Sequence, residues 1–180
     1  MVRPYRTGQC RAACYGILGA VDTPTIYCRE NGSLRVDGVE VLRDARGNPI
    51  RTEGRGKGNF ALCRCGASPI KPFCDGTHKT TGFRSARSAG GEWGAAAKRR
   101  DHGACAEEAS TPVIEVTAHG PYVVTGRIEL IDAEHGGRTA AARYALCRCG
   151  RSADKPFCDG SHREVGFADP GLDTTDPAGS

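Results

Sequence analysis

Large apolar side chains are scarce in this chain of 180 residues, which has one Met, one Trp and only 6% aromatic residues. It contains no run of about 18 apolar residues, so we expect no membrane-spanning helix. It shows no nucleophile–base pair, phosphate-binding loop or cluster of carboxylates, so the sequence does not support an enzyme. No basic run alternates with aromatic residues, which disfavours nucleic-acid binding.

Cysteine and glycine, in contrast, are abundant, with 10 and 25 residues. Six of the cysteines belong to a repeated motif, in which CRCGASPIKPFCDGTH (63–78) recurs as CRCGRSADKPFCDGSH (147–162). Each copy has the spacing C-x-C-x8-C-x3-H, and the two copies are separated by a constant offset of 84 residues. Each copy would belong to a unit of roughly 60 residues, and a unit of that size buries too little apolar surface to be stable alone. Metal coordination should therefore contribute to folding.

The spacing within each copy predicts two pairs of metal ligands. Two cysteines separated by one residue suit an extended segment that holds one metal ion. A cysteine and a histidine four residues apart lie on one face of a helix and suit a second ion. Two pairs match a [2Fe-2S] cluster, in which each iron takes two protein ligands. The predicted ligands are Cys63, Cys65, Cys74 and His78 in the first copy and Cys147, Cys149, Cys158 and His162 in the second.

The cysteines have two other interpretations. Three cysteines and one histidine also form a zinc site, although zinc sites usually contain C-x2-4-C pairs, and both pairs here are C-x-C. A disulfide framework would suit a small secreted protein, but no apolar signal segment is visible, so we expect a reducing compartment. The four remaining cysteines are expected to be reduced thiols: Cys10, Cys14, Cys28 and Cys105. The alternative is a third metal site formed by Cys10, Cys14 and Cys28.

The pattern C-x-C-x2-[ST]-x3-P-x-C-D-G-[ST]-H resembles the signature of the CDGSH iron-sulfur (NEET) family, and both copies match it at every position. The resemblance implies a [2Fe-2S] cluster held by three cysteines and one histidine beside a small β-sheet cap. It also implies electron or cluster transfer rather than catalysis. Two motifs in one chain are similar to the monomeric, mitochondrial-type branch of the family, in which the halves imitate a homodimer.

Alternating apolar residues predict the rest of the fold. Leu34 and Val36, like Ile114 and Val116, alternate with polar residues and indicate strands with one buried face. We therefore expect a small, mostly β (α+β) fold with about three strands, a metal-binding loop and one short helix in each half, and the halves packed as a pseudo-dimer. The expected segments are an N-terminal segment 1–24, CDGSH domains 25–84 and 113–167, a linker 85–112 and a disordered tail 168–180.

Asp75 and Asp159 stand where a carboxylate can cap the helix that carries the histidine. Tuning of the cluster's reduction potential is their alternative role.

Charge is distributed unevenly between the halves. Residues 1–84 contain 14 basic and 7 acidic residues, whereas residues 113–180 contain 7 and 10. Opposite net charges favour pairing of the halves within a monomer, with further dimerisation open, and could also steer a redox partner.

We expect a non-enzymatic protein with two [2Fe-2S] clusters that are labile in acid. Its predicted role is to transfer electrons to a redox protein, to transfer clusters to an apo iron-sulfur acceptor, or to sense redox state. A metal-stabilised interaction module is the alternative. Arginine outnumbers lysine by 20 to 5, a bias that favours a bacterial cytoplasmic protein, with the mitochondrial matrix as the alternative.

Overall fold

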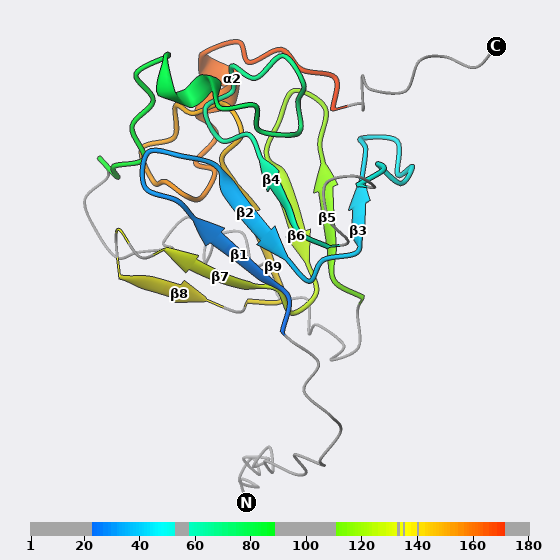
Figure 1. The fold of residues 1–180 in the computed structure, drawn as a ribbon. Helices are drawn as coiled ribbons and strands as arrows, with labels where there is room; N and C mark the ends of the chain where they lie inside the picture. Colours follow the sequence, from blue (N-terminus) through cyan, green and yellow to red (C-terminus); the bar gives the residue numbers. More distant parts are fainter. Residues whose placement is uncertain are drawn as a thin grey trace, which may run out of the picture.

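The computed structural model describes residues 23–52, 58–88, 111–132, 134, 136–139 and 141–171. The first half contains β1 (Thr25–Cys28), β2 (Leu34–Asp37), β3 (Val41–Arg43), β4 (Phe60–Leu62) and the 3-10 helix η1 (Thr77–Lys79). The second contains β5 (Val113–Val116), β6 (Tyr122–Thr125), β7 (Glu129–Asp132), β8 (Gly137–Thr139), β9 (Arg143–Leu146) and α2 (Ser161–Glu164). The predicted small, mostly β fold with short helices is confirmed (Figure 1). None of these residues forms a helix with the length and hydropathy of a membrane span.

The number of strands differs from the prediction of about three in each half, because the described residues form four strands in the first half and five in the second. The unexpected strand β8 lies in a polar stretch that has no run of alternating apolar residues. It forms because its backbone pairs with β7, where Ile131 faces Arg138. Such a strand is defined by its neighbour in the sheet rather than by its own sequence.

Two sheets are built from strands of both halves. The first sheet has the order β4-β2-β1-β7-β8 and the second β3-β5-β6-β9. Strands β7 and β8 of the second half thus extend the sheet of the first half, and β3 of the first half extends the sheet of the second. Two parallel strand pairs join the halves: β1–β7, with Thr25 opposite Glu129, and β3–β5, with Val41 opposite Val113.

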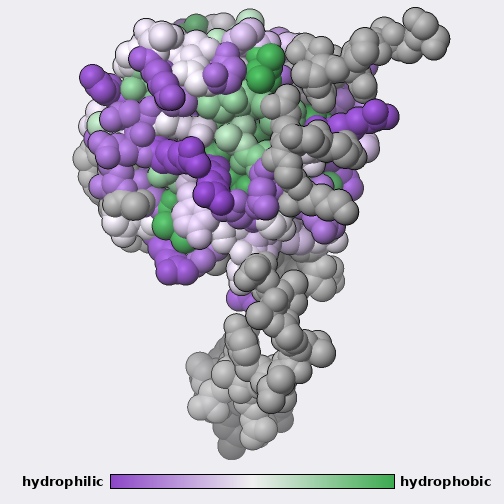
Figure 2. Space-filling model, viewed as in Figure 1, coloured by the Kyte–Doolittle hydropathy of each residue, from purple (hydrophilic) through white to green (hydrophobic). Residues whose placement is uncertain are grey.

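The two halves share one hydrophobic core. In β2, Leu34 and Val36 are fully buried while Arg35 between them is exposed, as the alternation predicted. Ile114 and Val116 are fully buried in the same way on β5. All four belong to one cluster of buried side chains that draws on both sheets. Polar and charged residues cover most of the visible surface (Figure 2), as expected when only alternate strand residues face inward.

The chain that follows each motif packs onto the body of the protein. Ser85 is fully buried and its amide donates to Asn31 Oδ1 (3.0 Å), and Arg87 Nε lies 2.6 Å from Asp154 Oδ1 in the other half. Asp169 is buried as well, and the Gly171 carbonyl accepts from the amide of Ala45 (3.2 Å). Residues 168–171 therefore differ from the predicted disordered tail. The rest of that tail (172–180), linker residues 89–110 and most of the N-terminal segment (1–22) lie outside the described residues.

Candidate metal centre

The two motif loops (63–78 and 147–162) begin directly after strands β4 and β9, at the end of the molecule where η1 and α2 lie (Figure 1). The first loop folds back on its strand, because the Cys63 amide donates to the Pro72 carbonyl (2.8 Å) and the Cys74 amide to Ala61 (2.8 Å). The second loop repeats both bonds at Cys147 and Cys158 (2.8 and 2.9 Å). Each loop thus brings its third cysteine back to the strand that precedes its first two.

A buried serine holds each loop closed. The Ser68 hydroxyl donates to the Phe73 carbonyl (2.8 Å), and the Ser68 carbonyl accepts from Lys71 Nζ (2.7 Å). Ser152 makes the corresponding bonds to Phe157 and Lys155, both at 2.6 Å. Both hydroxyls are buried, so their bonds replace those that they would make to water. The first Ser/Thr position of the motif, occupied by Ser68 and Ser152, therefore has a structural role.

The predicted ligands lie together in pairs. The two sulfurs of the C-x-C segment are 3.7 Å apart in the first loop (Cys63 and Cys65) and 3.8 Å apart in the second (Cys147 and Cys149). Two sulfurs held about 2.3 Å from one tetrahedral ion would be roughly 3.8 Å apart. No disulfide joins any of the seven cysteines in the described part of the chain.

The remaining ligands form the second pair of each loop. Cys74 Sγ lies 3.4 Å from His78 Nδ1, and Cys158 Sγ lies 3.3 Å from His162 Nδ1. Both imidazoles therefore present Nδ1 to the site. Among the described residues, no three or more His, Cys, Asp or Glu side chains are arranged to hold a single metal ion. The geometry suits two ions in each loop, with two protein ligands each.

One sulfur of each C-x-C pair is poised to be a thiolate. The hydrogen bond from Cys63 lowers the pKa of Cys65 to about 6 and raises the pKa of Cys63 itself. The hydrogen bond from Cys147 lowers the pKa of Cys149 to about 6 in the same way. Since the thiolate is the form that binds metals, each loop offers one at neutral pH.

The two sites differ in their exposure to solvent. In the first loop Cys63 is fully buried, but Cys65, Cys74 and His78 are partly exposed. All four predicted ligands of the second loop are buried, and His162, the most exposed of them, is 9% exposed. The first site is therefore the more accessible to protons and to a partner.

The aspartates act on the helices, although one position earlier than predicted. The N-cap residues are Gly76 and Gly160, which have positive φ angles of 95° and 107°. The Asp75 carboxylate accepts from the amide of Thr77 (3.0 Å), and its bonds to Thr77 hold the pKa of Asp75 below its usual value. Asp159 accepts from the Ser161 amide (2.9 Å) in the same manner.

Backbone contacts bring the two motif loops together. A Cβ atom on Gly66 would lie 2.9 Å from the Cys149 carbonyl oxygen, and one on Gly150 would lie 2.6 Å from that of Cys65. Both distances are below 3.0 Å, and Cβ atoms essentially never make contacts that short. Only glycine permits this approach, so each C-x-C segment rests on the glycine that follows the other.

Tyr122 is a residue of the site that the sequence analysis missed. It lies on β6 of the second half, is fully buried, and its hydroxyl donates to the carbonyls of Cys63 (2.8 Å) and Pro72 (3.0 Å) in the first loop. No repeat signal could reveal it, because the corresponding residue of the first half is Leu34. It ties the second half to the first site.

Two buried arginines, which the sequence analysis also missed, tie the motif loops to neighbouring segments of the chain. Arg64 and Arg148 occupy the middle of each C-x-C segment and are each 1% exposed. Arg64 Nε donates to the Gly32 carbonyl (3.1 Å), whereas Arg148 also forms an ion pair with Asp169. The presence of an arginine at this position in both copies of the motif was the sequence signal that could have identified them.

Cys28 is buried on β1, which raises its pKa to about 12 and keeps it a protonated thiol. The other three non-motif cysteines lie outside the described residues.

Comparison with known proteins adds a family to this geometry. The family model described as the iron-binding zinc finger of CDGSH type matches residues 31–79 and 119–163, which together make up more than half of the chain. No curated protein gives a significant match. The family's domain indicates an iron-sulfur cofactor and is generally not an enzyme. With two matching segments that contain both motif loops, the chain belongs to the CDGSH iron-binding family.

Proposed function

We propose that each half binds one [2Fe-2S] cluster through three cysteines and one histidine, and that the protein transfers electrons or clusters. The observation that carries the proposal is the division of each ligand set into two pairs. Within each pair the donor atoms are 3.3–3.8 Å apart, as two ligands of one tetrahedral ion should be. A [2Fe-2S] cluster needs two such pairs, one for each iron.

A zinc site is the second candidate, and the same observation disfavours it. Structural zinc is four-coordinate, so all four side chains would have to surround one ion. The described residues contain no group of three or more suitable side chains around one point.

Histidine suits a redox or release function. A neutral imidazole in place of a thiolate makes a bound cluster less negative, which raises its reduction potential to on the order of zero millivolts, between the plant ferredoxin and Rieske values. His78 and His162 present Nδ1 to the site, and that nitrogen can bind either a metal or a proton. We therefore expect the cofactor to be released as the pH falls.

The pseudo-dimer is part of the proposal. Strands β3 and β7 each pair with the sheet of the other half, and each C-x-C segment contacts the glycine after the other. Two subunits of a homodimer would exchange strands and loop contacts in this way, and here the exchange takes place within one chain. It supports a monomer in which two clusters lie near one another.

The partner is proposed to be a redox protein or an apo iron-sulfur acceptor that approaches the first site. An approach to the first site is supported by the partial exposure of Cys65, Cys74 and His78, because the predicted ligands of the second site are buried.

The test uses the iron-loaded protein in two assays. A redox titration followed by visible absorption should give reversible reduction of two clusters at potentials well above the ferredoxin range. Incubation with an apo-ferredoxin should show whether clusters move to an acceptor. Iron-loaded protein that is neither reversibly reduced nor able to donate clusters would support the interaction-module alternative.

A further inference from the structure

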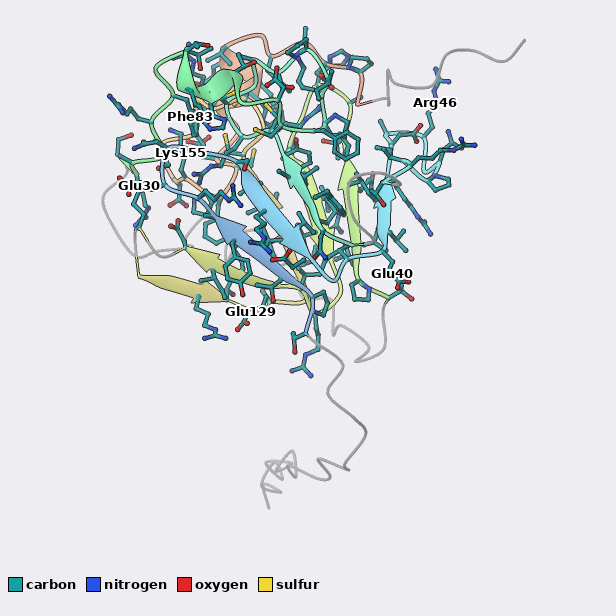
Figure 3. All side chains as sticks on the ribbon, viewed as in Figure 1. Glu30, Glu40, Arg46, Phe83, Glu129 and Lys155 are labelled. Atoms are coloured by element: carbon teal, nitrogen blue, oxygen red, sulfur yellow. The ribbon has the colours of Figure 1, made fainter. Side chains whose placement is uncertain are left out.

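A cavity of about 470 Å³ opens beside Cys65, and residues of both halves line it. The first half contributes Thr81, Phe83 and Arg84, and the second contributes Arg151 and Lys155. Phe83 and Lys155 lie close together in Figure 3, although 72 residues separate them in the chain. Three of the lining residues carry positive charge and none carries a carboxylate.

Two of these charges are available to a ligand. Arg84 and Arg151 are exposed, and within the described residues neither has an ion-pair partner. Lys155 is only 7% exposed, and its Nζ donates to the Ser152 carbonyl (2.6 Å), which fixes the ammonium without neutralising it. Its neighbour Asp154 is paired with Arg87 at 2.6 Å. The cavity therefore keeps a net positive field.

The second site has no such set of charges. With the 84-residue offset, Ala168 corresponds to Arg84, Ala67 to Arg151 and Val165 to Thr81. Lys71 corresponds to Lys155, but its Nζ lies 3.7 Å from an oxygen of Asp169. The motif requires none of these differences, since all of these residues, including the lysine, fall outside its fixed positions. The charge cluster is thus a property of the first site alone.

We propose that this cavity binds an anionic group, a phosphate or a carboxylate, next to Cys65. The guanidinium groups of Arg84 and Arg151 supply paired donors that match the oxygens of either group. Thr81 adds a hydroxyl and Lys155 a partly desolvated charge. The anionic group belongs either to a small molecule or to an acidic side chain of a partner protein. If the proposed function holds, its negative charge lies near the first cluster and lowers the potential of that cluster.

Calorimetric titration of the iron-loaded protein tests the site directly. The two probes are inorganic pyrophosphate, for a small-molecule phosphate, and a glutamate-rich peptide, for a partner's carboxylates. We expect one binding site per chain, and about a tenfold or greater loss of affinity in Arg84→Gln and in Arg151→Gln, since each variant removes a charge-assisted hydrogen bond to the anion.

The control is Arg46→Gln, which removes the same charge from an exposed arginine far from Phe83 and Lys155 (Figure 3). It should bind both probes as wild type does, and the iron content of every variant reports that the protein is folded. Preference for one probe identifies the source of the anionic group.

The proposal would be overturned if neither probe bound, or if Arg84→Gln, Arg151→Gln and Arg46→Gln all bound with the same affinity. The outcome does not depend on redox activity, because calorimetry measures binding alone. Loss of the anion site leaves two reducible clusters, whereas failure of the proposed function leaves a protein without them. A further readout is the redox titration, in which the preferred probe should lower one potential of wild type and neither potential of Arg84→Gln.

Discussion

Replacement of Gly150 by alanine tests the contact between the two motif loops. Gly150 follows the second C-x-C segment, has a φ of +78°, and would place a Cβ atom 2.6 Å from the carbonyl oxygen of Cys65 in the other half. The obstructing atoms are backbone, which cannot move aside as a flexible side chain could. The substitution should therefore push the two loops apart.

The expected cost has two parts. A left-handed conformation costs an alanine about 1–2 kcal/mol. Overpacking against backbone adds about 1–3 kcal/mol, so the loss for Gly150→Ala is about 2–5 kcal/mol. Gly47 isolates the first part, because it has a φ of +86° and nothing would lie within 4 Å of its Cβ atom. Gly47→Ala should lose only about 1–2 kcal/mol.

Thermal unfolding of the two iron-loaded variants measures the difference. In a protein of this size each kcal/mol corresponds to about 2–4 °C in Tm, so Gly150→Ala should melt lower than Gly47→Ala by roughly 2–12 °C. Visible absorbance, followed in the same scan, should show early loss of the cofactor in Gly150→Ala, because the displaced backbone carries Cys65. Equal Tm values in the two variants would refute the proposed contact between the loops.

Three further predictions concern single side chains. Tyr122→Phe removes the donor to two buried carbonyls, including that of Cys63, and should lower the free energy of unfolding by about 1–3 kcal/mol, measured by thermal unfolding; an unchanged Tm would contradict this. Asp169→Ala leaves Arg148 buried without its charged partner and should cost about 3–5 kcal/mol, whereas a truly disordered tail would tolerate the change. His78→Cys removes the imidazole that a proton can capture, so the variant should keep its visible absorbance to lower pH than wild type; the same acid lability in both would argue against release through histidine.

The ligands could be predicted from the sequence because the motif is repeated with every cysteine and histidine at the same spacing. Four residues of separation predicted that Cys74 and His78 lie on one face of a helix. The structure brings them to 3.4 Å, but only His78 lies on the helix, because η1 begins at Thr77. The strands at Leu34 and Ile114 were predictable for a similar reason, since alternation identifies a buried face.

Other features could not be predicted, because they depend on what lies next to a residue in space. Alternation identifies the buried face of β3 and β7 but not the neighbouring strand, so it could not reveal their exchange between the sheets. Tyr122 is indistinguishable in sequence from an ordinary core aromatic residue. Arginine is almost never fully buried unless paired, so the interior position of Arg148 was not expected, nor was that of its partner Asp169 in a short polar stretch.

Iron, acid-labile sulfide and zinc should be quantified on one sample of the purified protein together with its visible spectrum. The proposed function predicts a red-brown protein with about four iron and four sulfide per chain, because each pair of ligands holds one iron of a [2Fe-2S] cluster. A colourless protein with about two zinc per chain, even from cells supplied with iron, would contradict it.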